Sequence, residues 1–125
     1  MSKRLLVVDD EERIREVVRA CLEDLGGWSV LTADSGQTGL QVALDTPVDA
    51  VLLDISMPDM DGFEFVKQFR QYQQLANIPI ILLTAKVIAV EQERFAQMPV
   101  NGTIPKPFNP LTLCGDIAAL LGWEL

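Results

Sequence analysis

The stretch AVLLDISMPDMDG, from Ala50 to Gly62, brings four apolar residues directly to an aspartate and then to two more acids. A short apolar run of this kind is typical of a strand that is buried on both faces of a sheet. A carboxylate at the end of such a strand has lost much of its water, so Asp54 needs either a compensating cation or a chemical task.

The same pattern recurs before and after this stretch. LLVV at 5–8 and IILL at 80–83 have the length and composition of buried strands, and WSVLTA at 28–33 and GTIP at 102–105 predict two weaker ones. Helical patterns lie between the strands. They cover 11–25, a segment from Ser35 through Asp45, a segment capped by Asp61, 90–97, and a segment with Asn109 as cap and Pro110 at its first position. This alternation predicts an α/β fold, with a five-stranded parallel sheet covered by helices on both faces.

Composition limits the function classes. A length of 125 residues indicates a single domain spanning 1–125. The 18 acidic residues outnumber the 10 basic ones, for a net charge of -8, so we expect no direct nucleic-acid partner and no membrane partner. Two cysteines without a C-x-x-C spacing, and no histidine, support neither a zinc site nor a disulfide framework. A reducing cytoplasm fits this composition best.

Polar residues mark the ends of the predicted strands: Asp9 and Asp10, Asp54, Thr84, and Lys106. In a doubly wound sheet ligands bind beyond the carboxyl ends of the strands, where the strand order reverses. If the order is 2-1-3-4-5, three carboxylates crowd together there and require a cation. Oxygen ligands without histidine or cysteine suit Mg²⁺.

Four motifs carry a resemblance to a known family: LLVVDDEERIR at 5–15, LLDISMPDMDG at 52–62, IILLTAK at 80–86 and IPKPF at 104–108. In this order they resemble the receiver domain of two-component response regulators, and the resemblance spans essentially the whole chain. It implies the flavodoxin-like strand order 2-1-3-4-5 with five helices. It also implies a stand-alone, chemotaxis-type regulator that is a signalling switch and not an enzyme, apart from self-phosphotransfer and slow self-dephosphorylation.

The resemblance assigns roles at the site. Asp54 is the expected phosphoacceptor, which takes a phosphoryl group from a histidine kinase or a phosphotransfer protein. Mg²⁺ is expected on Asp9, Asp10, Asp54 and the backbone carbonyl of Ser56.

The two remaining polar residues are assigned to the phosphoryl group. Thr84 and Lys106 are expected to contact its oxygens, and a cis peptide before Pro107 is expected to aim the lysine inward.

Plainer interpretations exist. In one of them Asp54 only caps the next helix, but Pro58 and Asp61 lie between Asp54 and that helix, and Asp61 is better placed as a cap. Asp9 and Asp10 also suit the start of a helix, where acids favour the dipole, and one of them can serve both purposes.

Rival protein classes remain to be weighed. A haloacid-dehalogenase-type phosphatase needs a D-x-D motif after its first strand, but this chain has Glu11 in place of the second aspartate. A flavodoxin-type cofactor binder needs a phosphate-binding loop rich in serine, threonine and glycine, but this chain has the acidic stretch DDEER there, which would repel a phosphate. A degenerate receiver that binds partners without phosphorylation stays open as the alternative.

Two features bear on partners. The last helix and its flanks carry more apolar residues than one buried face needs, so some should be exposed: Leu111, Leu113, Cys114, Ile117, Ala118, Leu120, Leu121 and Trp123. Two explanations of this apolar excess remain equal alternatives. In one, the helix is deeply buried and followed by an apolar tail. In the other, the face formed by helix four, strand five and helix five binds a downstream target or a second copy. Thr103 stands where the family usually has an aromatic residue, and we expect it to weaken the response of strand five.

Overall fold

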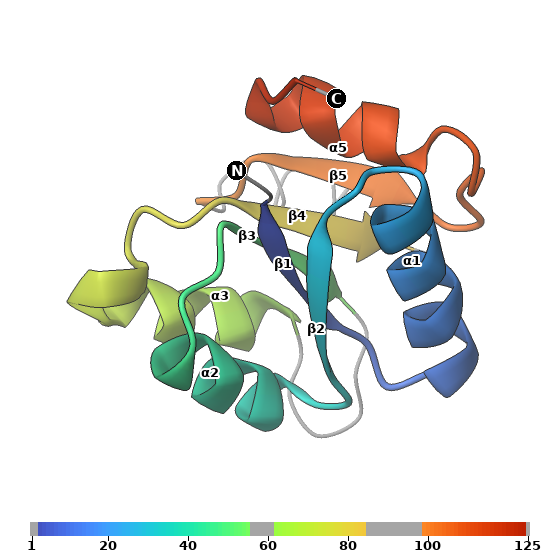
Figure 1. Cartoon of the computed structure of the whole chain (residues 1–125). Coiled ribbons are helices and arrows are strands. Elements are labelled where there is room, and N and C mark those ends of the chain that lie inside the picture. The colour runs from blue at the N-terminus through green and yellow to red at the C-terminus, as the bar shows by residue number, and fades with distance from the viewer. Residues whose placement is uncertain (1–2, 56–61, 85–98, 125) are drawn as a thin grey trace, which may run out of the picture.

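The computed structural model describes residues 3–55, 62–84 and 99–124 (Figure 1). Five parallel strands form one sheet in the order β2-β1-β3-β4-β5, which confirms the predicted topology. The strands are β1 (Arg4–Val8), β2 (Ser29–Ala33), β3 (Ala50–Asp54), β4 (Ile80–Thr84) and β5 (Gly102–Pro105). The helices are α1 (Glu12–Asp24), α2 (Gly36–Asp45), α3 (Gly62–Gln71), the short 3₁₀ helix η1 (Gln73–Leu75) and α5 (Leu113–Leu121).

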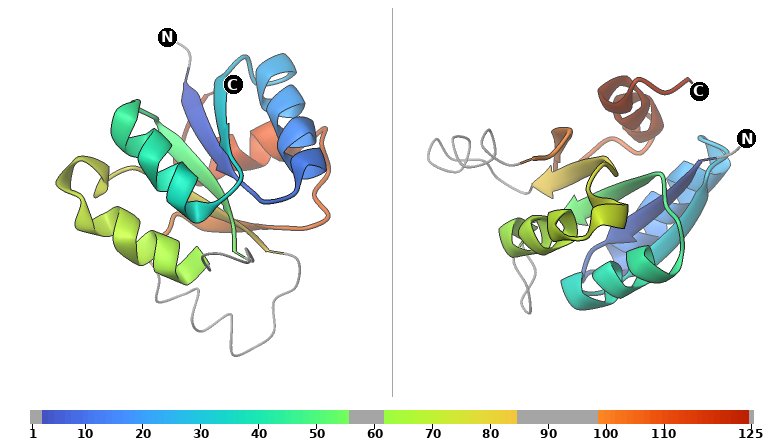
Figure 2. Two further views of the ribbon diagram at one scale, coloured as in Figure 1. Left: turned by 90° about the horizontal axis from the view of Figure 1, so that it is seen from below. Right: turned by 90° about the vertical axis from the view of Figure 1, so that its left-hand side faces the viewer.

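The described helices cover both faces of the sheet. Helices α1 and α5 lie on one face and α2 and α3 on the other, as the two further views show (Figure 2). The predicted helix at 90–97 and the proposed cap Asp61 lie outside the described residues. None of the helices in the described ranges is long and apolar enough to cross a membrane.

The core is divided by the sheet into two clusters, and β3 contributes to both. Ala50 and Leu52 pack on the side of α1 and α5, whereas Val51 and Leu53 pack on the side of α2 and α3. All five residues of β3 are buried. The apolar run before Asp54 is therefore a strand covered on both faces, as its composition predicts.

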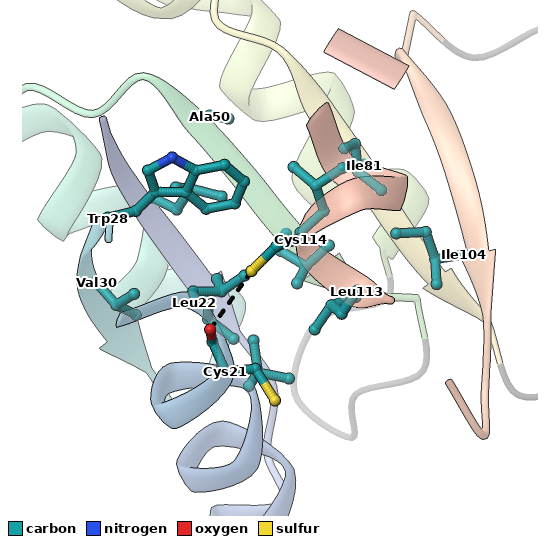
Figure 3. Close-up of a cluster of buried hydrophobic side chains, with 14 of the residues drawn as sticks. Cys21, Leu22, Trp28, Val30, Ala50, Ile81, Ile104, Leu113 and Cys114 are labelled. Atoms are coloured by element: carbon teal, nitrogen blue, oxygen red, sulfur yellow. Dashed lines mark hydrogen bonds between the residues drawn. The ribbon is translucent and has the colours of Figure 1, made fainter. Parts of the chain in front are cut away.

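Helices α1 and α5 meet at their cysteines, and two tryptophans outside the helices pack near this contact. The Sγ atom of Cys114 donates a hydrogen bond of 3.4 Å to the backbone carbonyl of Cys21 (Figure 3). Trp28 and Trp123 form an edge-to-face pair with ring centroids 5.4 Å apart. Burial raises the pKa of both thiols, so they remain protonated at neutral pH.

Two glycines let helices approach the strands next to the acidic edge. A Cβ atom on Gly39 would lie 2.8 Å from Val8, and one on Gly62 would lie 2.4 Å from Ile55. The backbone of Gly62 has no positive φ, so the close approach to Ile55 is what requires glycine at this position.

The helix caps follow the sequence at α2 and depart from it at α5. The side chain of Ser35 accepts a 3.1 Å hydrogen bond from the amide of Thr38, which confirms the predicted cap. The cap predicted at Asn109 was wrong, because α5 begins only at Leu113. The Asn109 side chain instead accepts from the amide of Leu111, and its carbonyl accepts from the amide of Thr112, which closes a turn before the helix.

Candidate functional site

The polar residues singled out in the sequence lie at one edge of the sheet, where the parallel strands end. Asp9 follows β1, Asp54 and Thr84 are the last residues of β3 and β4, and Lys106 follows β5. The ladder continues one step further through the hydrogen bond from the Lys106 amide to the Thr84 carbonyl, 2.7 Å. The strand register therefore brings residues from four separate segments to one place.

Three carboxylates meet at this edge. Oxygen atoms of Asp9, Asp10 and Asp54 all lie within 4.8 Å of one another. Asp9 and Asp54 are buried, with 0% and 3% of their surface exposed, whereas Asp10 is exposed. The site is therefore open to solvent on the side of Asp10 and closed on the side of the sheet.

Asp9 is fixed by its neighbours at every polar atom except one. Its amide donates to the carbonyl of Ala33, its Oδ1 atom accepts from the amide of Glu11 at 2.9 Å, and its carbonyl accepts from the Nη1 atom of Arg15 at 2.8 Å. Its buried Oδ2 atom lacks a hydrogen-bond donor among the described residues. That oxygen lies 3.3 Å from the Nζ atom of Lys106, which is an ion pair without hydrogen-bond geometry.

Lys106 bridges two of the acids. Its Nζ atom lies 3.3 Å from Asp9 Oδ2 and 3.3 Å from Asp54 Oδ2, and only 14% of the side chain is exposed. Burial alone would lower the pKa of Lys106, but the negative charges of Asp54 and Asp9 outweigh it and raise the pKa above its usual value. The lysine is therefore charged at neutral pH. The Lys106–Pro107 peptide is cis, as the resemblance implied.

The charges of the site suit a small divalent cation. Three carboxylates against one ammonium leave an excess of negative charge, and no described residue donates a hydrogen bond to Asp9 Oδ2. An all-oxygen donor set is the one that Mg²⁺ prefers. The residues present thus fit this ion.

The other predicted residues stand as follows. Thr84 is buried with 1% exposed, and Ser56, whose carbonyl was expected among the ligands, lies outside the described residues.

Thr103 is exposed on β5, where it borders a groove of about 300 Å³ together with Ala119 and Leu120. Leu120 and the preceding Leu111 are 40% and 81% exposed, which confirms that part of the apolar excess faces outward.

Sequence reasoning missed two arginines. Arg15 has no role predicted from the sequence, yet it binds the carbonyl of Asp9. Arg70, in the last turn of α3, donates hydrogen bonds to the carbonyl oxygens of Leu75, Ala76, Ile78 and Pro99 at 2.6 to 3.2 Å. The signal available for Arg15 was its place near the start of a helix, where a cation opposes the dipole.

Comparisons with known proteins agree with this geometry. The sequence model of the response regulator receiver domain matches residues 5–118. The chain is 36% identical over 112 residues to the chemotaxis protein CheY-3 of Vibrio cholerae, a match that covers 90% of this chain and 86% of that protein.

Solved structures show the same likeness. The crystallised chemotaxis protein CheY4 of Vibrio cholerae superposes with a TM-score of 0.89 at 34% identity, covering 96% of this chain and 99% of that one. The receiver domain of the sensor histidine kinase PA1611 from Pseudomonas aeruginosa superposes with a TM-score of 0.86 at 27% identity, covering 98% and 99%. That structure holds a magnesium ion in its active site cleft.

Proposed function

The chain belongs to the response regulator receiver domain family, and on that premise we propose that it is a phosphoacceptor switch whose phosphorylated residue is Asp54. Receiver domains of two-component systems are signalling switches and not enzymes in the ordinary sense. The observation that carries the proposal is the cluster of three carboxylates with Lys106 between Asp9 and Asp54.

Asp54 is the acid best placed for the transfer. It ends a fully buried strand beside Lys106, and it is the acid that the family resemblance identifies as the phosphoacceptor. A carboxylate oxygen of Asp54 forms the new bond to phosphorus while the bond from phosphorus to the donor's histidine nitrogen breaks. The product is an aspartyl phosphate.

The three acids together would also hold the metal. Asp9, Asp10 and Asp54 would bind Mg²⁺, together with the backbone carbonyl of Ser56 as the family resemblance implies. When bound, the ion neutralises charge on the phosphoryl oxygens during a transfer that depends on positioning and electrostatics. The magnesium ion in the cleft of the PA1611 receiver domain supports this assignment.

Lys106 and Thr84 would receive the phosphoryl group. The Lys106 ammonium already lies beside Asp54 and is charged at neutral pH, so it can pair with a phosphoryl oxygen. The Thr84 side chain ends the neighbouring strand and can donate its hydroxyl hydrogen to another.

The partners follow from this chemistry. The phosphoryl donor would be a histidine kinase or a phosphotransfer protein, and the phosphorylated form would bind a downstream protein in the cytoplasm. The proposed unit is a single receiver domain spanning 1–125, similar to chemotaxis-type regulators. Self-association through β5, α5 and the predicted helix at 90–97, which lies outside the described residues, remains a proposal, supported by the exposure of Leu111 and Leu120.

Intact mass spectrometry after incubation with acetyl phosphate tests the proposal. The wild-type chain should gain one phosphoryl group in Mg²⁺ and none when a chelator removes the ion. Asp54→Asn should gain none in either condition, because an amide is a poor nucleophile. An unmodified wild-type chain in Mg²⁺ would instead favour the degenerate receiver.

A further inference from the structure

The side chain of Arg15 reaches back past the start of its own helix to the turn that carries the acids. Arg15 is the fourth residue of α1, and its Nη1 atom donates a 2.8 Å hydrogen bond to the Asp9 carbonyl. A cation in the first turns of a helix is unfavourable because it opposes the helix dipole. The hydrogen bond to the Asp9 carbonyl offsets that cost.

This contact completes the fixation of Asp9. The Asp9 amide donates to Ala33 and its Oδ1 atom accepts from the amide of Glu11. With the bond from Arg15 to the carbonyl, Oδ2 is the one polar atom of Asp9 without a hydrogen-bond partner in the described part of the chain. Oδ2 is also the atom that lies beside Lys106. The backbone and side chain of Asp9 are thus oriented so that one oxygen faces the site.

The same contact acts on Asp10. The Asp9 carbonyl and the Asp10 amide belong to one planar peptide unit, so a bond that fixes the carbonyl also fixes the start of Asp10. The Asp10 carboxylate is exposed and has no hydrogen-bond partner among the described residues. Arg15 therefore fixes the peptide unit from which the Asp10 residue extends.

We propose that Arg15 is a positioning residue of the metal site, which holds the Asp9–Asp10 peptide so that both carboxylates are presented to Mg²⁺. The inference rests on the proposed function, because it assumes that these acids bind the ion. The hydrogen bond of Arg15 is to the Asp9 carbonyl, so Arg15 acts through the backbone of that residue.

The chain offers a matched control one turn further along α1. Arg19 lines the same surface hollow of about 190 Å³ as Arg15, with Glu12, Glu16 and Thr32. Its Nε atom pairs with Glu23 at 3.3 Å, and 55% of its side chain is exposed. Replacing either arginine by glutamine removes the same charge from the same side of the helix, but only one replacement removes the contact with Asp9.

The direction in which the Mg²⁺ affinity changes distinguishes a positioning role of Arg15 from a simple effect of its charge. Removing a cation near an acidic site should by itself tighten Mg²⁺ binding, because less positive charge repels the ion. Losing the orientation of Asp9 and Asp10 should weaken it. Partners that orient metal ligands are typically worth 10-fold or more in affinity, and a contact to the backbone of a ligand belongs at the low end of that range.

Calorimetric titration of Mg²⁺ into the wild type, Arg15→Gln and Arg19→Gln, well below their melting temperatures, tests the inference. We expect Arg15→Gln to raise the dissociation constant about 10-fold and Arg19→Gln to leave it unchanged. Arg15→Lys keeps the charge and a single donor group, and should fall between Arg15→Gln and the wild type. It also serves as the test variant if Arg15→Gln does not fold.

The outcomes are distinct. Unchanged or tighter binding by the Arg15 variant, or equal weakening by the Arg19 variant, would overturn the positioning role while the proposed function stands. A wild-type chain that binds no Mg²⁺ would overturn the proposed function, and the positioning role with it. A general loss of stability would lower the melting temperature of the metal-free protein without changing the affinity of the folded fraction.

Discussion

Lys106 and Arg70 are both half-buried cations, but their surroundings are opposite. Lys106 lies between two carboxylates, which raise its pKa despite burial. Arg70 donates to four backbone carbonyl oxygens, and burial lowers its pKa. The lysine thus supplies a point charge that another cation can replace. The guanidinium supplies several donors in a fixed geometry, for which a metal ion in the acidic site is no substitute.

The largest effect should come from Arg70. Arg70→Ala removes every bond to the segment after α3 and to Pro99, so we expect the free energy of unfolding to fall by about 3 kcal/mol. Arg70→Lys should recover less than half of it, since an ammonium cannot reach all four carbonyls. Urea unfolding measures the loss, with Lys67→Ala on the exposed side of α3 as control. Equal losses for Arg70→Ala and Lys67→Ala would show that the carbonyl contacts contribute nothing.

Lys106 should give a smaller effect that depends on metal. In a chelator, Lys106→Ala leaves three carboxylates without their cation, and we expect a loss of about 2 kcal/mol. Mg²⁺ should restore most of it, because the ion binds the folded acidic site more tightly once the lysine is gone. The same ion should restore no more stability to Arg70→Ala than it adds to the wild type. If Mg²⁺ stabilises both variants equally, the contrast between the two cations is wrong.

The smallest expected effect is the decrease in the free energy of unfolding at alkaline pH. Because the pKa of Lys106 is raised above 10.5 in the folded state, its contribution is fully present below that pH and is lost as pH rises through the folded pKa. The thiols of Cys21 and Cys114, whose pKa values are raised from 9.0, add a decline of the same sign from about pH 9. The Lys106→Met variant should keep the thiol decline and lose the lysine part, so the difference between the two unfolding curves isolates Lys106. Parallel curves up to the highest accessible pH would rule out the raised pKa.

Much of the fold was predictable because local pattern and global topology agree. Strands such as β3 and β4 are short apolar runs with no competing periodicity, and the ends of these strands carry the site residues. The sequence could not show that Asp9 is buried and Asp10 exposed, since two adjacent aspartates have the same chemistry and differ only in the direction in which each side chain points. That difference depends on the packing of β1 between β2 and β3.

The misses share a physical cause, which is hydrogen bonding between side chains and backbone groups. The 3₁₀ helix η1 has no periodic signal, and its end is bonded by Arg70 through the carbonyl of Leu75. The start of α5 was misplaced because the Asn109 side chain closes a turn instead of capping a helix. Arg15 looks like a solvated charge until the β1 end is placed beside it.

The central claim is that the buried strand end Asp54 is the residue that accepts the phosphoryl group. Peptide mapping of the wild-type chain after reaction with acetyl phosphate and Mg²⁺ tests it most directly. We predict that the phosphoryl group is found on the peptide that contains Asp54 and that chelation abolishes it. A phosphoryl group on the peptide of Asp9 and Asp10, or labelling of equal extent without Mg²⁺, would contradict the account.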